Sequence, residues 1–126
     1  MRIEHLALNL DDAPAVVAWY SRHLAMPIQH EVRSPIYVAF LGEPPVLLEI
    51  YCNPMQPRLA PAAWDPLTLH LAVSSNDLIG DQARLIAAGA AHHEGRADAD
   101  GYGLVFLRCP WGLPLQLCRR RLPLSA

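Results

Sequence analysis

Four polar side chains stand in otherwise apolar stretches of the sequence and have the chemistry of metal ligands. They are His5, Glu49, His70 and Gln116. An ionised carboxylate such as Glu49 is costly to bury unless it is paired or bound to a cation. Two imidazoles, a carboxylate and an amide oxygen suit Zn²⁺, Ni²⁺, Co²⁺, Mn²⁺ or Fe²⁺ and leave coordination positions open for water or substrate. The residue types therefore predict an open divalent-metal site of the kind used in reactions.

The spacing of the four residues relates them in two pairs. The interval from His5 to His70 is nearly the same as the interval from Glu49 to Gln116. The two intervals differ slightly, and a small difference in loop length between the two halves would account for this. Repeated spacing of this kind indicates an internally duplicated chain, in which each half supplies equivalent positions.

The surrounding pattern predicts the same order of elements in both halves, namely strand, helix and three strands. Alternating and helical periodicities and turn residues define these segments. In the first half we expect strands at 3–10, 28–33, 36–41 and 46–52, with a helix after Asp11-Asp12 that stops before Pro27. In the second half we expect strands at 67–74, 92–96, 102–108 and 113–119, with a helix after 75–77 that Gly89 ends.

The organisation that follows is a single α+β domain over residues 1–126, built from two tandem βαβββ modules. Module one spans about residues 1–53 and module two about residues 67–121. Between them, residues 54–66 contain four prolines and no sustained period, which is typical of a linker.

The alternation of strand faces selects further candidate site residues. Small side chains share a face with the two histidines, Ala7 with His5 and Ala72 with His70, and leave room for a ligand. On the same reasoning Asn9, on the face of His5, and Tyr51, beside Glu49, are candidate substrate contacts. Both side chains are equally compatible with an ordinary cleft lining.

Composition excludes several classes of function. The chain is 52% hydrophobic and 17% charged, which is typical of a globular protein, and its net charge of −2 predicts no nucleic-acid partner. Every basic residue is arginine, and the run Arg119–Arg121 is either a solvated end or an anion grip. No apolar run is long enough to cross a membrane, and three cysteines without CxxC spacing argue against disulfides and thiolate zinc. We therefore expect a soluble cytoplasmic protein.

With these features in place, the sequence resembles the vicinal oxygen chelate superfamily, which contains glyoxalase I, extradiol dioxygenases and bleomycin-resistance proteins. The likeness covers nearly the whole chain. It is carried by the segments 3–8 (IEHLAL), 19–26 (WYSRHLAM), 48–50 (LEI), 69–73 (LHLAV) and 109–117 (CPWGLPLQL). The resemblance implies modules that curl around a cleft, with metal ligands from the first and last strand of each module, which are the four positions already selected.

The resemblance also implies a range of activities. Glyoxalase-like members are lyases or isomerases that move a proton in a metal-bound substrate, with a glutamate at the metal as the base. Gln116 stands where catalysing members usually carry glutamate, and an amide cannot take a proton at neutral pH. Glu49 is therefore the expected catalytic base. Ala25, where the family usually has glycine, and Cys109, where it usually has aspartate, depart from the pattern in loops.

Three functions follow from this reading. The first is a metal-dependent lyase or isomerase that acts on a small oxygenated substrate. The second is a non-catalytic small-molecule binding protein of the bleomycin-resistance type, which Gln116 favours. An Fe²⁺ dioxygenase ranks last, because its facial triad normally takes the carboxylate from the final strand. The resemblance further implies a homodimer.

Overall fold

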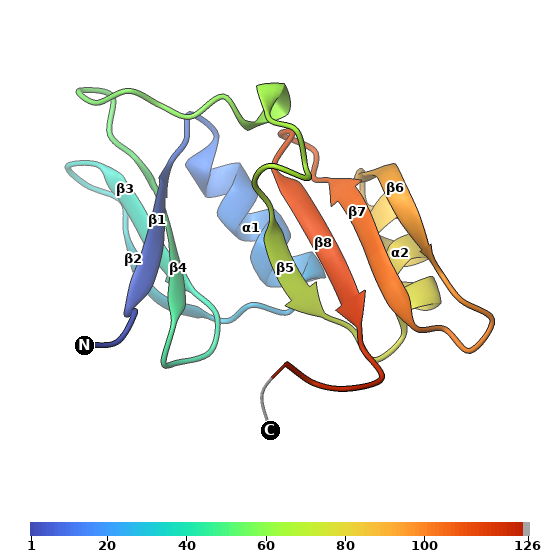
Figure 1. Ribbon diagram of the computed structural model, residues 1–126. Helices are drawn as coiled ribbons and strands as arrows, with labels where there is room; N and C mark the ends of the chain where they lie inside the picture. The colour runs from blue at the N-terminus through green and yellow to red at the C-terminus, as the bar shows by residue number, and fades with distance from the viewer. Residues whose placement is uncertain (125–126) are drawn as a thin grey trace. The chain divides into compact units, whose positions relative to one another are not determined.

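Two four-stranded sheets, each accompanied by one long helix, make up the fold (Figure 1). The computed structural model describes residues 1–124, so residues 125 and 126, the end of the expected domain, lie outside the described part. The chain divides into two units, the first from Met1 to Ala60 and the second beginning at Pro61.

The first unit has the order strand, helix, three strands. Its elements are β1 (His5–Asn9), α1 (Ala13–His23), β2 (Ile28–Val32), β3 (Tyr37–Leu41) and β4 (Leu47–Cys52). The sheet order is β1-β4-β3-β2, in which β1 runs parallel to β4 and the other neighbours are antiparallel. The predicted βαβββ module is confirmed.

The second unit repeats this order after a short 3₁₀ helix. Its elements are η1 (Pro61–Ala63), β5 (Leu71–Ser74), α2 (Leu78–Ala87), β6 (Ala91–Ala97), β7 (Gly103–Arg108) and β8 (Pro114–Arg119). The sheet order is β5-β8-β7-β6, with β5 parallel to β8 and the other pairs antiparallel. The internal duplication predicted from the spacing is therefore present in the topology.

One face of each sheet packs against the helix of its own unit. In the first unit α1 contacts β3 and β4, and Tyr20 and Ile50 are fully buried. In the second unit α2 contacts β6, β7 and β8, and Leu85 and Leu115 are fully buried. Each such side chain contributes about 1.5–3 kcal/mol through burial. Because side chains alternate along a strand, the residues between these core positions point to the opposite, open face of each sheet.

The ends of the two helices differ in detail. Asp77 caps α2 by accepting a hydrogen bond from the Gly80 N–H at 3.0 Å, whereas Asp12 makes no side-chain cap on α1. The backbone of Asp12, at φ −95° and ψ 28°, lies outside the extended region that N-cap residues usually adopt, whereas Asp77, at φ −140° and ψ 81°, lies closer to it. After α1 the chain turns through Ala25 at φ 52°, and after α2 through Gly89 at φ 105°. Alanine has a steric cost in this left-handed region that glycine avoids.

Neither long helix approaches membrane-spanning dimensions. Helix α1 has 11 residues and α2 has 10. Within residues 1–124, no helix combines the length and apolar character needed to cross a bilayer.

Candidate metal and substrate site

The first polar pair, His5 and Glu49, lies on the open face of the first sheet. His5 begins β1 and Glu49 is in the middle of β4, where the parallel register places Ala7 opposite Glu49. The Nε2 atom of His5 is 3.1 Å from Oε2 of Glu49. Glu49 is half-buried, with 18% of its side chain exposed, between the buried neighbours Leu48 and Ile50. The carboxylate predicted to need a partner therefore has one in the imidazole.

The other nitrogen of His5 contacts a second carboxylate. Its Nδ1 atom bonds to Oε2 of Glu4, the preceding residue, which is largely exposed. A carboxylate can only accept, so each of these contacts requires either a proton or a metal ion on the imidazole nitrogen. His5 is held between two carboxylates either as an imidazolium or as a neutral ring that donates through Nδ1 and presents Nε2 to a cation.

The second polar pair, His70 and Gln116, belongs to the second unit. The Nδ1 atom of His70 donates a hydrogen bond to the carbonyl oxygen of Pro66 at 2.7 Å. Because a carbonyl only accepts, Nδ1 carries a proton, so a lone pair in the neutral form of the ring would be on Nε2. Within residues 1–124, Nε2 of His70 forms no hydrogen bond or ion pair. His70 thus has the same arrangement as His5, with Nδ1 held by an oxygen.

The position of His70 differs from the expectation. The sequence pattern predicts a strand from residue 67, but β5 begins at Leu71 and His70 stands one residue before it. Asp65 is the physical reason: its side chain accepts a hydrogen bond from the Leu67 N–H, and its carbonyl accepts from the Thr68 and Leu69 N–H groups. These bonds fold residues 65–69 into a turn and remove them from the strand.

Gln116 is the most enclosed of the four predicted ligands. It lies in β8, only 6% exposed, and its Oε1 accepts a hydrogen bond from the Cys118 thiol at 3.0 Å. Burial raises the pKa of Cys118, against the opposing influence of Arg120, so the thiol remains protonated at neutral pH and can donate. An amide oxygen has two lone pairs, so Oε1 keeps one acceptor position for a further partner.

A phenylalanine on the third strand of each sheet adjoins each polar pair. Phe40 in β3 is opposite Glu49 in the register, and its ring meets the His5 ring edge to face at 5.5 Å. Phe106 in β7 is opposite Gln116, and its ring meets the His70 ring in the same way at 5.0 Å. Edge-to-face contacts hold the imidazole planes in a defined orientation.

These phenylalanines did not enter the sequence prediction, although a signal for them exists. The interval from Phe40 to Phe106 falls between the interval that relates the two histidines and the interval that relates the Glu/Gln pair. Glu4 was also missed, because an exposed acid next to a strand histidine carries no distinguishing pattern.

The two predicted substrate contacts have different surroundings. Asn9 is 6% exposed, and its amide is engaged with the following loop: Nδ2 donates to the carbonyls of Asn53 and Pro57, and Oδ1 accepts from the Asn53 N–H. Tyr51 is half-buried on the strand that carries Glu49. Asn9 therefore fixes the loop after β4, whereas Tyr51 shares the face of the first polar pair.

The four donor groups are of the types that hold divalent metals in proteins. Metal-binding histidines usually donate their second ring N–H to a carboxylate or a backbone carbonyl, as Nδ1 of His5 and of His70 do here. Two ligand atoms about 2.1 Å from one metal at right angles are about 3.0 Å apart, close to the separation of His5 Nε2 and Glu49 Oε2. Within residues 1–124, no group of three or more His, Cys, Asp or Glu side chains is arranged to hold a metal ion.

Comparison with known proteins identifies the family. The family model for the Glyoxalase/Bleomycin resistance protein/Dioxygenase superfamily matches residues 2–117. A search of curated proteins gives no match. Among solved structures, a glyoxalase family protein from Enterococcus faecalis is similar at 27% identity, with a TM-score of 0.68 and coverage of 94% of this chain and 97% of that one.

Two further structures share the fold. The trypanothione-dependent glyoxalase I of Leishmania major has 20% identity and a TM-score of 0.72, with coverage of 94% of this chain and 86% of that one. TnmS3, an antibiotic binding protein from Streptomyces sp. CB03234, has 14% identity and a TM-score of 0.67, with coverage of 94% of each chain. On the family match, this chain belongs to the Glyoxalase/Bleomycin resistance protein/Dioxygenase superfamily.

Proposed function

We propose that this protein is a metal-dependent lyase or isomerase of the glyoxalase-like type, acting on a small oxygenated substrate. The observation that carries the proposal is an arrangement shared by His5 and His70. In both, Nδ1 is bonded to an oxygen, and Nε2 is the ring atom that remains to bind a metal ion. In this proposal His5, Glu49, His70 and Gln116 hold one Zn²⁺, Ni²⁺, Co²⁺, Mn²⁺ or Fe²⁺ ion. The two units then act as one glyoxalase-like domain.

Each ligand has a defined task in the proposed reaction. The bound metal would supply stabilisation of the negative charge that develops on adjacent substrate oxygens. Glu49 is the proposed base: one of its oxygens faces His5, which leaves the other to take a proton from substrate carbon. Gln116 cannot take a proton at neutral pH, so its task is coordination through Oε1.

Of the two candidate substrate contacts, Tyr51 and Asn9, only Tyr51 keeps that role in the proposal. Tyr51 remains the proposed substrate contact, because it shares a strand and a face with Glu49. We assign Asn9 a positioning role instead, since its amide is bonded to the loop backbone at residues 53 and 57.

A specific observation also supports a second candidate function, the metal-free binding of a small molecule. Gln116 replaces the carboxylate of catalysing members, and its oxygen already accepts a bond from Cys118. The fold is shared with the antibiotic binding protein TnmS3. A third candidate, an Fe²⁺ dioxygenase, would use His5, His70 and Glu49 as two histidines and one carboxylate.

Metal analysis separates these candidates. Purified protein is reconstituted with each candidate metal, passed through a desalting column and analysed by inductively coupled plasma mass spectrometry. We expect about one metal per chain in the wild type and in the control His93→Ala, which removes an exposed histidine. His70→Ala and Glu49→Gln should each lower the content markedly. A wild type that keeps no metal would contradict the enzyme proposal and favour the binding protein.

A turnover assay then addresses the reaction. The metal-loaded protein is tested on the glutathione hemithioacetal of methylglyoxal, in parallel with Gln116→Glu, which restores the usual family carboxylate. Activity that requires Glu49 supports the lyase proposal. Oxygen uptake by the iron-loaded protein with a catechol would support the dioxygenase instead.

We further propose that the protein is a cytoplasmic homodimer. Within residues 1–124, the three cysteines, Cys52, Cys109 and Cys118, form no disulfide, which is compatible with a reducing compartment. Light scattering at micromolar concentration tests the assembly, and a monomeric mass would contradict the dimer.

A further inference from the structure

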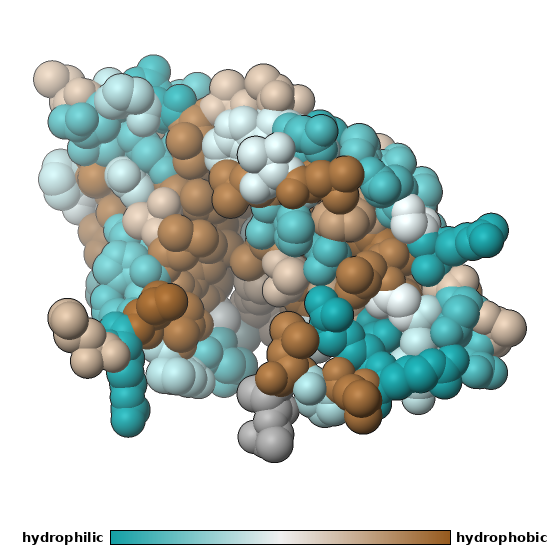
Figure 2. All heavy atoms as spheres, in the orientation of Figure 1, coloured by the Kyte–Doolittle hydropathy of each residue, from teal (hydrophilic) through white to brown (hydrophobic). Residues whose placement is uncertain are grey.

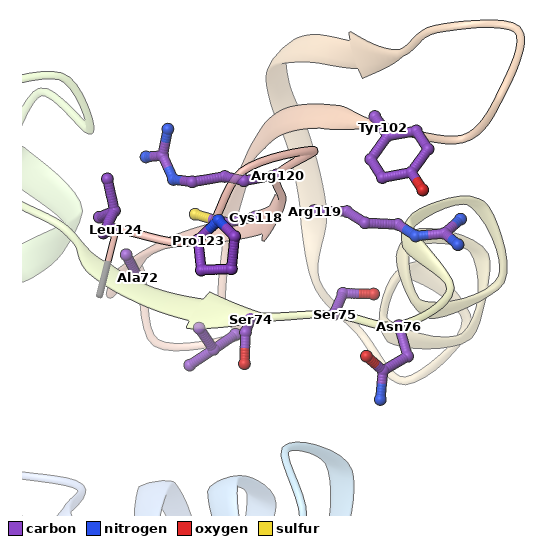
Figure 3. Close-up of a pocket in the computed structure, with 11 residues that line it drawn as sticks. Ala72, Ser74, Ser75, Asn76, Tyr102, Cys118, Arg119, Arg120, Pro123 and Leu124 are labelled. Atoms are coloured by element: carbon purple, nitrogen blue, oxygen red, sulfur yellow. The ribbon is translucent and has the colours of Figure 1, made fainter. Parts of the chain in front are cut away.

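A pocket in the second unit lies where strands β5 and β8 end and strand β7 begins (Figure 3). Its volume is about 600 Å³, enough for a small organic molecule. The described residues that line it are Ala72, Val73, Ser74, Ser75, Asn76, Tyr102, Cys118, Arg119, Arg120, Pro123 and Leu124. We call this cavity the C-terminal pocket.

The charge of the C-terminal pocket is positive. Two of its eleven described lining residues are arginines and none is acidic. Within residues 1–124, neither Arg119 nor Arg120 forms an ion pair, whereas the next residue, Arg121, pairs with Asp98 at 2.9 Å and Asp100 at 2.8 Å. The arginine run is thus divided into one neutralised residue and two whose charge is available to a ligand.

Arg119 is held in place by an aromatic ring. Its guanidinium lies 4.7 Å from the centre of the Tyr102 ring, and Figure 3 shows it extended toward that ring while Arg120 points the other way. Arg121 stacks on the same ring at 4.3 Å. A cation on an aromatic face keeps its charge and loses side-chain freedom, which prepares it for an anion.

The remaining walls combine polar and apolar groups. Ser74 and Asn76 are exposed and supply a hydroxyl and an amide, whereas the Ser75 hydroxyl is already bonded to Asp81. Figure 2 shows hydrophobic side chains at the surface of this face of the molecule, and Leu124 in the pocket lining is 85% exposed. The lining therefore suits a ligand with an anionic end and a short apolar part.

The pocket is connected to the proposed site through one side chain. Cys118 lines the C-terminal pocket and donates its thiol hydrogen to Oε1 of Gln116. We propose that the C-terminal pocket binds the oxyanion end of the substrate, a carboxylate or a phosphate, with Arg120 as the principal ligand and Arg119 as its neighbour. This inference rests on the proposed function and narrows its substrate class to small organic anions.

Anion binding is measured directly on the full chain by isothermal titration calorimetry at constant ionic strength. The probes are inorganic phosphate, butyrate and, as an uncharged match, butyramide. We expect at least one anion to bind and butyramide to bind at least tenfold more weakly. Arg120→Gln should weaken anion binding tenfold or more. Arg96→Gln makes the same charge change on an exposed residue outside the pocket and should have little effect.

The outcomes distinguish a phosphate ester from a carboxylic acid as the source of the anion. They also distinguish a failure of the pocket proposal from a failure of the metal-site proposal. Tighter phosphate binding assigns the pocket to phosphate esters, and tighter butyrate binding assigns it to carboxylic acids. The titration is repeated in a chelator and with His70→Ala, where anion binding should persist even if the metal proposal fails. No anion binding by the wild type, or equal losses in Arg120→Gln and Arg96→Gln, would overturn the pocket assignment. Changes in the amide NMR chemical shifts of Ser74, Asn76 and Arg120 on addition of the anion would locate its binding site in the pocket.

Discussion

The two polar pairs occupy equivalent places in a duplicated fold but differ in charge and in contact. In the first unit His5 and Glu49 touch directly, and a second carboxylate, that of Glu4, holds the other side of the imidazole. In the second unit His70 is held by a backbone carbonyl, and Gln116 is bonded to a neutral thiol. A phenylalanine in edge-to-face contact supports the histidine in both.

Because their side chains differ in chemistry, the two pairs of the duplicated fold are suited to different tasks. The first pair contains the only carboxylate among the four proposed ligands, so proton transfer is assigned to it. The second pair has no carboxylate and is more enclosed, and contributes lone pairs and a fixed geometry. Changes that exchange or weaken these properties should therefore affect the two units unequally.

The largest expected effect comes from exchanging the carboxylate between the pairs. Glu49→Gln removes the proposed base and should lower kcat/KM about 10²–10⁴-fold on the substrate that is turned over. Gln116→Glu should retain or raise activity, because it adds a carboxylate and leaves Glu49 in place. Steady-state kinetics on metal-loaded protein measure both. Equal losses of kcat/KM in the two variants would contradict the assignment of proton transfer to the first pair alone.

Asn9 and Ser74 occupy equivalent positions, because the interval between them equals the interval between the two histidines, and they provide the next contrast. Asn9→Ala removes three part-buried hydrogen bonds to the loop and should cost about 2 kcal/mol of unfolding free energy, measured in urea. Ser74→Ala changes an exposed residue and should stay within about 0.5 kcal/mol. If Asn9→Ala raised KM without loss of stability, the original substrate-contact role of Asn9 would be restored.

The Glu4 carboxylate contacts Nδ1 of His5, whereas a backbone carbonyl accepts from Nδ1 of His70. This contact can therefore be altered by mutation in the first unit alone. Glu4→Gln should weaken metal affinity about tenfold, the lower end of the effect usual for groups that orient a metal-bound histidine, because Glu4 is largely exposed. Glu43→Gln, an exposed acid in a turn, is the matched control. Competition with a chromophoric chelator gives the affinities, and an unchanged value in Glu4→Gln would exclude this contribution.

The turns after the two helices provide a comparison of backbone strain. Ala25→Gly should stabilise the protein by about 1 kcal/mol, since it relieves a left-handed alanine at φ 52°. Gly89→Ala should destabilise it by a similar amount, because a Cβ atom there would lie 3.3 Å from Pro110 at φ 105°. Thermal unfolding measures both shifts, and a destabilised Ala25→Gly protein would contradict the assignment of strain.

The smallest effects are in pH dependence, where the units should respond at opposite ends of the scale. Burial, together with Glu31, raises the pKa of Tyr37 in the first unit, so its stabilisation is present below the unfolded pKa of about 10 and is lost as pH rises above it. Burial raises the pKa of Asp81 in the second unit, but hydrogen bonds from Ser75 and Arg84 outweigh it and leave the pKa lowered.

The stabilisation from Asp81 is consequently present above an unfolded pKa of about 4 and is lost as pH falls below it. Each contribution should be on the order of 1 kcal/mol or less. Urea unfolding from pH 3 to pH 11 should show a weaker alkaline slope in Tyr37→Phe and a weaker acid slope in Asp81→Asn. Unaltered slopes would assign the pH dependence to other groups.

The fold was predictable because its signals are local and repeated. The alternation of apolar residues in the strands and the nearly constant repeat interval are sufficient for the βαβββ order in both halves. The start of β5 was misplaced, because the hydrogen bonds of Asp65 override the apolar pattern of residues 67–69. The missing side-chain cap on α1 could not be predicted either, because it depends on the backbone dihedral angles of Asp12.

The candidate site was predictable only in its residue types. Sequence periodicity places His5 and Glu49 on the same kind of face, but their 3.1 Å contact depends on the parallel register of β1 and β4. The partners of Nδ1, one a neighbouring side chain and one a backbone carbonyl, have no signature in the sequence. The C-terminal pocket depends on which arginines find acidic partners, and that is decided by the turn at residues 98–100.

The most direct test of the central claim counts the imidazoles at the metal. Extended X-ray absorption fine structure of the cobalt-loaded protein should give two imidazole ligands in the wild type and in His93→Ala, at about one cobalt per chain. His5→Ala and His70→Ala should each reduce the count to one, or abolish binding. Two imidazoles in both of these variants, or a wild type that binds no metal, would contradict a site shared by the two polar pairs.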